Sequence, residues 1–108
     1  MTADELFRAL GDPTRLEIVR RLSNRESCTI SMLLSGLGIS RQGARKHLQL
    51  LADANIVTLK PDGRDTIVSL NRATLAKGKA FITEIELQWD KRLEALRQYV
   101  DNDQINDL

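Results

Sequence analysis

The segment Ser40–Val57, S-R-Q-G-A-R-K-H-L-Q-L-L-A-D-A-N-I-V, decides the fold that we expect for this chain of 108 residues. Apolar residues recur in it at helical spacing and share one face: Ala44, Leu48 and Leu51, with Leu50 and Ala54 beside them. Ser40 is a favourable N-cap. Asn55 stands where the helix should stop, because asparagine tolerates the left-handed backbone of a helix end. The segment therefore predicts an amphipathic helix from Ser40 to about Ala54.

The polar face of this predicted helix carries only cationic and amide side chains. They are Arg41, Gln42, Arg45, Lys46 and Gln49. No acidic residue occurs between Ser27 and Ala52. Arginine and glutamine can form forked hydrogen bonds with guanine and adenine edges in a DNA major groove, whereas a carboxylate would repel phosphate. For this helix taken alone, a solvated face that happens to lack glutamate is the alternative.

The sequence before this helix predicts a second, shorter helix. Thr29–Leu37 has a helical pattern, and Gly38 and Ile39 form a tight link to the Ser40 cap. Two short helices that are joined by a glycine-containing turn, the second of them basic, are typical of a helix-turn-helix.

The sequence after the basic helix predicts a β-hairpin. Ile56–Lys60 and Thr66–Leu70 are short β-like runs on either side of Pro61–Asp65, which has the composition of a turn. A helix-turn-helix followed by a hairpin is a winged helix, and its wing would carry Lys60 and Arg64 to the DNA backbone or a minor groove. The expected fold class is therefore mainly α with a small β-hairpin, a winged helix-turn-helix with a long C-terminal helix.

Two further helices are predicted at the N-terminus. Thr2 caps the first, Gly11 ends it, and its apolar side consists of Leu6, Phe7 and Leu10. The second begins at Asp12-Pro13 and runs to about Leu22. In this second helix we expect Leu16, Ile18 and Val19 to point inward, and Arg15, Arg20 and Arg21 to point outward.

One long helix is predicted from Ala73 to about Asn102. Its apolar residues form a single stripe at helical spacing: Ile82, Ile85, Trp89, Leu93, Leu96 and Val100. A chain this short has little core left to cover so long a stripe, so we expect a homodimer interface. The alternative is that the helix folds back onto its own domain.

The length of 108 residues predicts a single domain, and the composition is that of a globular protein. The chain is 42% hydrophobic and 29% charged, and it contains one cysteine, which excludes a disulfide framework. No apolar run approaches the roughly 20 residues of a membrane span, and no signal peptide is evident, so we expect a cytoplasmic protein without membrane contact. Residues 1–72 hold 11 Lys/Arg against 8 Asp/Glu, whereas residues 73–108 hold 5 against 7. The cationic part is thus the part with the predicted helix-turn-helix.

Several motifs in order resemble the ArsR/SmtB family of winged-helix repressors. The similarity covers Leu10–Leu16, Ser40–Val57, Gly63-Arg64, Leu70-Asn71 and the late run Trp89–Tyr99, which is similar to a branch without metal ligands. Asn55 replaces the glycine that is usual in the family at the helix exit. The resemblance implies a single domain over residues 1–108, dimerisation through the first and last helices, and binding to operator DNA.

The ligands of the family's metal sites are missing from the matching positions. Thr29 and Ser31 occupy the two thiolate positions, and no histidine follows His47. One cysteine and one histidine in a chain cannot supply the four ligands of a typical zinc site, so we expect neither metal nor cofactor. Cys28 could act as a redox switch, although most lone cysteines are buried apolar residues.

The sequence therefore predicts a homodimeric, sequence-specific double-stranded-DNA-binding transcriptional regulator that represses its own or neighbouring genes. Arg41, Gln42 and Arg45 would contact base edges, and Ser40, Lys46 and Gln49 would contact phosphates. Two alternatives are a winged-helix protein-interaction module with an acidic partner, and a repressor that responds to thiol oxidation through Cys28. No catalytic constellation is visible, so an enzyme is not expected, and the sequence indicates no effector.

Overall fold

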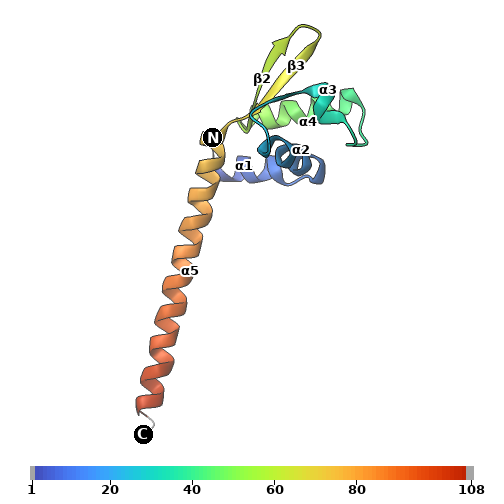
Figure 1. Ribbon diagram of the computed structural model, residues 1–108. Helices are drawn as coiled ribbons and strands as arrows, with labels where there is room; N and C mark the ends of the chain where they lie inside the picture. The colour runs from blue at the N-terminus through green and yellow to red at the C-terminus, as the bar shows by residue number, and fades with distance from the viewer. Residues whose placement is uncertain (1, 107–108) are drawn as a thin grey trace. The chain divides into compact units, whose positions relative to one another are not determined.

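The computed structural model describes residues 2–106, and its helices and strands follow the order of a winged helix (Figure 1). The elements are α1 (Ala3–Leu10), α2 (Pro13–Ser23), β1 (Cys28–Thr29), α3 (Ile30–Leu34), α4 (Arg41–Asp53), β2 (Val57–Asp62), β3 (Asp65–Leu70) and α5 (Arg72–Asn106). The predicted fold class, mainly α with a small hairpin and a long last helix, is confirmed. The chain divides into two compact units, Met1–Gly78 and Lys79–Leu108.

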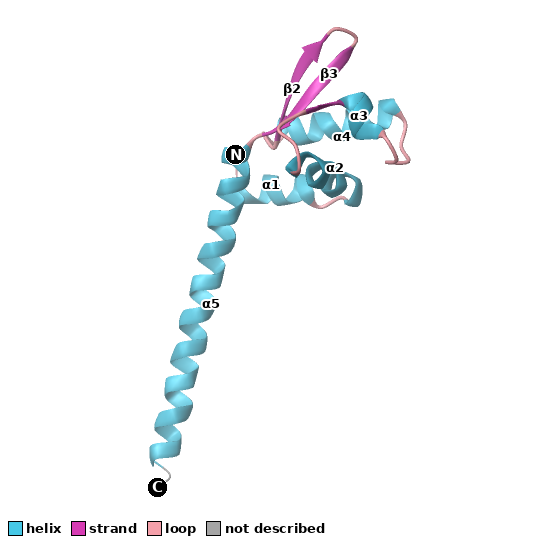
Figure 2. Cartoon of the chain, in the orientation of Figure 1, coloured by secondary structure: helices cyan, strands magenta, loops and turns pink. Residues whose placement is uncertain are grey.

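The hairpin belongs to a three-stranded antiparallel sheet with the order β1-β3-β2 (Figure 2). Pairing of Asp62 with Asp65 leaves Gly63 and Arg64 as a two-residue loop, and Gly63 supplies the positive φ of 59° that such a tight turn needs. Pro61 lies in β2, which is an edge strand, so the missing N–H of the proline is tolerated. The predicted hairpin is confirmed, but β1 was not predicted.

The core of the first unit lies between the helices and one face of the sheet. The largest fully buried side chains are Ile18 and Leu22 of α2, Leu48 and Leu51 of α4, Ile56, and Val68 of β3. Two expectations about apolar residues are wrong. Leu16, which we expected to point inward, is 51% exposed, and Leu50 is also half exposed. Each lies on a part of its helix that is outside the buried core.

Side chains at the helix starts explain where the helices begin. The carboxylate of Asp12 accepts hydrogen bonds from the backbone N–H of Thr14 (2.9 Å) and of Arg15 (3.1 Å) at the start of α2. The Ser40 hydroxyl accepts one from Gly43 (3.0 Å) at the start of α4. These bonds satisfy N–H groups that have no partner inside a helix. Both predicted N-caps are confirmed.

Gly78 permits close packing of α5 against α1 within the first unit. A Cβ at this position would lie 2.5 Å from Cδ2 of Leu6, so no larger residue fits without displacement. Leu6 is only 2% exposed. Leu6 therefore packs in the core of its own chain and has almost no exposed surface for contact with a second chain. The predicted place of Leu6 in a dimer interface is corrected.

In the second unit, every side chain from residue 79 to residue 102 is exposed. The predicted apolar stripe of α5 is therefore uncovered in the single chain. None of the described helices, α5 included, is long and apolar enough to cross a membrane.

Candidate nucleic-acid interface

The helix α4 is anchored by one face and presents the other to solvent. Ala44, Leu48 and Leu51 are at most 1% exposed. The opposite face carries five exposed polar side chains, namely Arg41, Gln42, Arg45, Lys46 and Gln49. Burial of the apolar face fixes the direction in which the basic face points, because neighbouring turns of a helix cannot rotate independently.

A carboxylate lies at the far end of this basic face. The Nε2 group of Gln49 donates a hydrogen bond to Oδ1 of Asp53 (2.8 Å), one helical turn later. Residues four positions apart are neighbours on a helix, so this contact could have been predicted from the sequence, but we did not predict it. Gln49 therefore uses one of its two amide N–H donors for Asp53, and one N–H remains to donate to phosphate.

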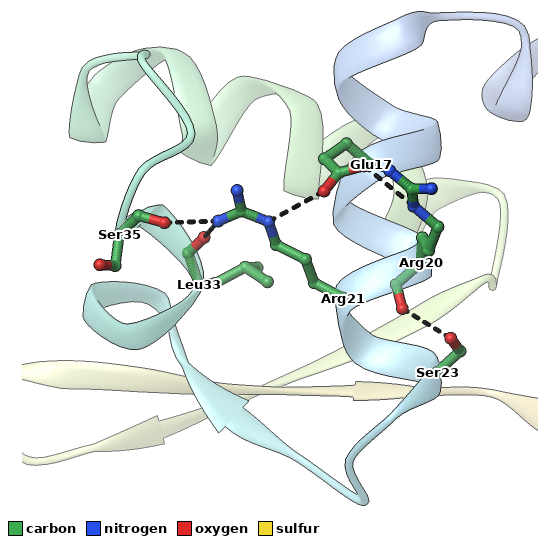
Figure 3. Close-up of polar contacts among 6 residues, drawn as sticks. All are labelled: Glu17, Arg20, Arg21, Ser23, Leu33 and Ser35. Carbon is green, nitrogen blue, oxygen red and sulfur yellow. Dashed lines mark hydrogen bonds and ion pairs between the residues drawn. The ribbon is translucent and has the colours of Figure 1, made fainter.

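An arginine of α2 holds the turn that precedes α4. Nη1 of Arg21 donates to the backbone carbonyls of Leu33 (3.0 Å) and Ser35 (2.6 Å), and its Nε donates to Glu17 (3.2 Å) (Figure 3). These carbonyls lie at the end of α3, where a helix has no internal donors left for them. The expectation that Arg21 points outward into solvent is thus wrong, because its guanidinium spans from α2 to the helix-turn-helix.

Arg41, the first residue of α4, makes contacts that the sequence did not indicate. Its Nη2 lies 3.2 Å from Oδ1 of Asp65, at the start of β3, and its Nη1 donates to Oγ of Ser31 (3.1 Å). The Ser31 hydroxyl in turn donates to Oδ2 of Asp65 (2.6 Å). The three side chains thus form a closed network, which joins α3, α4 and the wing. Asp65 is a residue of the candidate site that the sequence did not predict, because its partners are far away in the chain.

The carboxylate of Asp65 is stabilised in its charged form. The Ser31 hydroxyl, the backbone N–H of Thr66 and the charge of Arg41 hold the pKa of Asp65 below its ordinary value. Asp65 is thus ionised at neutral pH, and its charge lies beside the first turn of α4.

The wing carries its two predicted cations on exposed positions. Lys60 lies in β2, opposite Ile67 of β3, and Arg64 lies in the two-residue loop. Neither forms an ion pair with any residue that the structure describes. Both cations are therefore available to an anionic partner.

A second contact fixes α4 to α2. Arg15 donates through Nε to the carbonyl of Ala9 (2.6 Å), and its Nη1 lies 3.3 Å from Nδ1 of His47. A guanidinium can only donate, so Arg15 is the donor of this contact. The carboxylate of Asp12 lies 3.9 Å from the same Nδ1. Arg15 is half-buried here, so its predicted outward position is also wrong.

Cys28, the residue considered for redox chemistry, is a core residue. It is 6% exposed and pairs with Val68 in the sheet. Burial raises the pKa of the Cys28 thiol, although Arg25 partly opposes this effect. The thiolate is the reactive form of cysteine, so both features oppose a redox role.

The two positions that correspond to thiolate ligands serve other purposes. Thr29 caps α3 by accepting from the N–H of Met32 (3.2 Å), and Ser31 belongs to the network with Arg41. In the described part of the chain, no three His, Cys, Asp or Glu side chains gather closely enough to hold a metal ion.

A basic helix on an anchored helix-turn-helix, beside a hairpin that exposes Lys60 and Arg64, defines the DNA-binding domain of a winged-helix regulator. Comparison with known proteins agrees. Residues 10–60 match the family model of a helix-turn-helix domain. Over 78 residues, the chain is 38% identical to the uncharacterised HTH-type transcriptional regulator YuzN of Bacillus subtilis, which covers 67% of this chain and 85% of the relative.

Two further comparisons cover most of the chain. It is 30% identical over 100 residues to the HTH-type transcriptional regulator Rv2034 of Mycobacterium tuberculosis, covering 93% of this chain and 90% of the relative. The solved structure of an ArsR-like transcriptional regulator from Rhodococcus sp. RHA1 superposes with a TM-score of 0.74 at 33% identity, covering 89% of this chain and 90% of the other. The chain belongs to the ArsR family of helix-turn-helix transcriptional regulators.

Proposed function

We propose that this regulator is a homodimeric repressor, independent of metal ions, that binds a near-palindromic operator with one α4 helix in each half-site. The observation that carries the proposal is the division of α4 into a buried apolar face and an exposed basic face. A major groove admits such a helix, and two half-sites should lie about 34–36 Å apart, or a multiple of that distance. Repression is supported by the resemblance to ArsR/SmtB repressors.

Roles within the interface follow from position and from the partners that each side chain already has. Arg41, Gln42 and Arg45 lie in the first two turns of α4, so we assign base contacts to them. Lys46 and the Ser40 hydroxyl, which can donate its proton while it accepts from Gly43, would bind phosphates. We assign Gln49 a weaker phosphate contact because its amide is bound to Asp53. Lys60 and Arg64 would bind the flanking backbone.

The dimer is supported by the uncovered stripe of α5. Its six residues are Ile82, Ile85, Trp89, Leu93, Leu96 and Val100, and all are exposed in the single chain. Isolated helices in water are marginal, and amphipathic helices are usually stabilised by packing of their apolar face. A second copy of the same stripe would supply that packing. Phe7 and Leu10 of α1, both half-buried, would extend the interface, whereas Leu6 would not.

The proposal that the regulator does not sense metals rests on the chemistry of the available side chains. The hydroxyls of Thr29 and Ser31 replace thiolates and take part in other hydrogen bonds. His47 uses its Nδ1 for Arg15. We therefore assign the protein neither a metal nor another cofactor, and no catalytic role.

The experiment compares Arg45→Ala in α4 with Arg64→Ala in the wing. A duplex selected from a randomised library by the wild-type protein serves as the operator, and a scrambled duplex is the reference. Arg45→Ala should weaken operator binding by about 1–3 kcal/mol and relax preference at one base per half-site, as expected for a bidentate contact. Arg64→Ala should weaken binding to both duplexes and lower the salt dependence by about one unit per lost phosphate contact.

The melting temperature serves as a control, because both side chains lie outside the core. If the wild type enriches no sequence, or if the two variants behave alike, the recognition-helix assignment is wrong. A basic face that instead binds an acidic protein would then explain the same surface.

A further inference from the structure

The network of Arg41, Ser31 and Asp65 places a negative charge inside the interface that we propose for DNA. Of the residues 2–106, Asp65 is the only carboxylate that forms an ion pair with an arginine of α4. A carboxylate near a DNA backbone costs binding free energy, because it repels phosphate. Its position therefore needs an explanation beyond general affinity for DNA.

Within this pair, Asp65 is the more firmly held side chain, and it orients Arg41. The side chain of Asp65 is 24% exposed, whereas that of Arg41 is 44% exposed. Asp65 is itself fixed by the hydroxyl of Ser31 (2.6 Å) and by the backbone N–H of Thr66 (2.8 Å). Arg41 has no other fixed partner, so its orientation depends on this network.

The contacts use only part of the guanidinium. Asp65 accepts from Nη2 and Ser31 accepts from Nη1, while Nε has no partner within the described part of the chain. Asp65 needs only one of the two protons of Nη2, so the second Nη2 proton and the Nε proton, which lie on one edge of the guanidinium, can donate two parallel hydrogen bonds. This is the arrangement that pairs with O6 and N7 of guanine.

We infer that Asp65 is a specificity-determining residue, which holds Arg41 in position for a base edge and keeps its charge from acting freely on phosphates. This inference rests on the proposed function. A side chain that is already ordered loses less conformational entropy when it binds its base. A guanidinium that is already paired gains less from a phosphate at any sequence. Both effects increase the difference in binding free energy between the operator and unrelated DNA.

The network also joins the two parts of the interface. Asp65 directly follows Arg64, the cation of the wing loop, and it contacts the first residue of α4. Loss of the carboxylate should therefore loosen the wing relative to the recognition helix as well as free Arg41.

The test compares Asp65→Asn with the matched variant Asp62→Asn. Both remove one negative charge from the same hairpin, at residues that pair across the turn, but the side chain of Asp62 makes no hydrogen bond or ion pair in the described structure. Asparagine at position 65 keeps an acceptor for the N–H of Thr66. Binding is measured over a range of salt concentrations on the duplex that the wild type selects from a randomised library, and on a scrambled duplex.

For Asp65→Asn, the preference for the selected duplex should fall by about tenfold, near the lower limit for one bidentate contact. Binding to the scrambled duplex should become tighter, with a salt slope that is steeper by about 0.9 for each phosphate that Arg41 newly neutralises. Asp62→Asn should change binding to both duplexes by the same factor. Ser31→Ala, which alters no charge, should also lower the preference if positioning matters.

The outcomes separate this inference from the proposed function. If the wild type selects no sequence, the proposed function fails, and the inference fails with it. If the wild type selects an operator but Asp65→Asn matches Asp62→Asn, only the inference is overturned. Circular dichroism and the melting temperature establish that each variant is folded.

Discussion

Asn55 determines where α4 ends and where the wing begins. Its φ of 57° lies in the left-handed region, and it is the only residue other than glycine with a positive φ among those described. The N–H of Asn55 donates to the carbonyl of Ala52 and that of Ile56 to the carbonyl of Leu51, both at 2.9 Å. These two bonds form a Schellman motif, and the buried side chains of Leu51 and Ile56 complete it. The predicted left-handed end of the helix is confirmed.

The left-handed backbone makes Asn55→Ala destabilising. Asparagine adopts this backbone region more readily than alanine does, so the free energy of unfolding should fall by about 1 kcal/mol. Asn55→Gly should stay within about 0.5 kcal/mol of wild type, since glycine adopts this conformation freely. Denaturant unfolding measures both.

Asn24 provides the matched control for this change. It also ends a helix, α2, but with a φ of −92° that any residue adopts. Asn24→Ala should therefore lower the free energy of unfolding much less than Asn55→Ala does. Equal losses at both positions would mean that backbone conformation does not explain the role of Asn55.

At the scale of the elements, Arg21 stabilises the helix-turn-helix by joining α2 to the end of α3. The turn itself contains two left-handed glycines, Gly36 (φ 73°) and Gly38 (φ 75°), which permit the sharp change of direction. Glycines lose much backbone freedom on folding, so a turn built from them needs support from elsewhere. The guanidinium of Arg21 gives that support through the carbonyls of Leu33 and Ser35.

We expect Arg21→Ala to lower the free energy of unfolding by about 1.5–3 kcal/mol, the usual value for hydrogen bonds to a charged group. The side chain of Arg21 is only 30% exposed, and its loss leaves two carbonyls without their donor. The loosened turn should also weaken operator binding, although Arg21 itself touches no DNA in the proposed complex. Denaturant unfolding and a binding titration measure the two effects.

Arg20→Ala is the control, because Arg20 pairs with the same Glu17 but is 77% exposed. Exposed ion pairs contribute little, so this variant should lose less than about 0.5 kcal/mol. If the two variants were equally stable, the carbonyl contacts of Arg21 would have no role in holding the turn.

Local patterns in the sequence predicted most of the elements, and the failures have a physical reason. Caps such as Asp12 and Ser40, and the end at Asn55, depend on neighbouring residues and were visible in the sequence. The strand β1 has two residues, too few for a pattern, and it exists only because β3 offers a partner. The pairing of Arg41 with Asp65 spans 24 positions, so no spacing rule could indicate it.

At the scale of the whole molecule, the proposed operator has two half-sites and therefore requires two DNA-binding domains. The helix α5 is the element that would hold two copies of the chain together. Within its exposed part, apolar side chains recur at intervals that keep them on one face, with Trp89 near the middle. The guanidinium of Arg92 lies 5.9 Å from the centre of the Trp89 ring. A guanidinium at this distance is attracted by the negative face of the indole ring.

Trp89 and Leu87 allow a direct test of the dimer, because both are more than half exposed in the single chain. They lie two positions apart, and therefore on nearly opposite sides of the helix. If the stripe forms the interface, Trp89→Ala should cost about 3–5 kcal/mol, shared between folding and association. Leu87→Ala should leave association unchanged. Sedimentation at micromolar concentration measures the oligomeric state. A well-folded monomeric wild type would exclude the proposal that a dimer binds two half-sites of one operator.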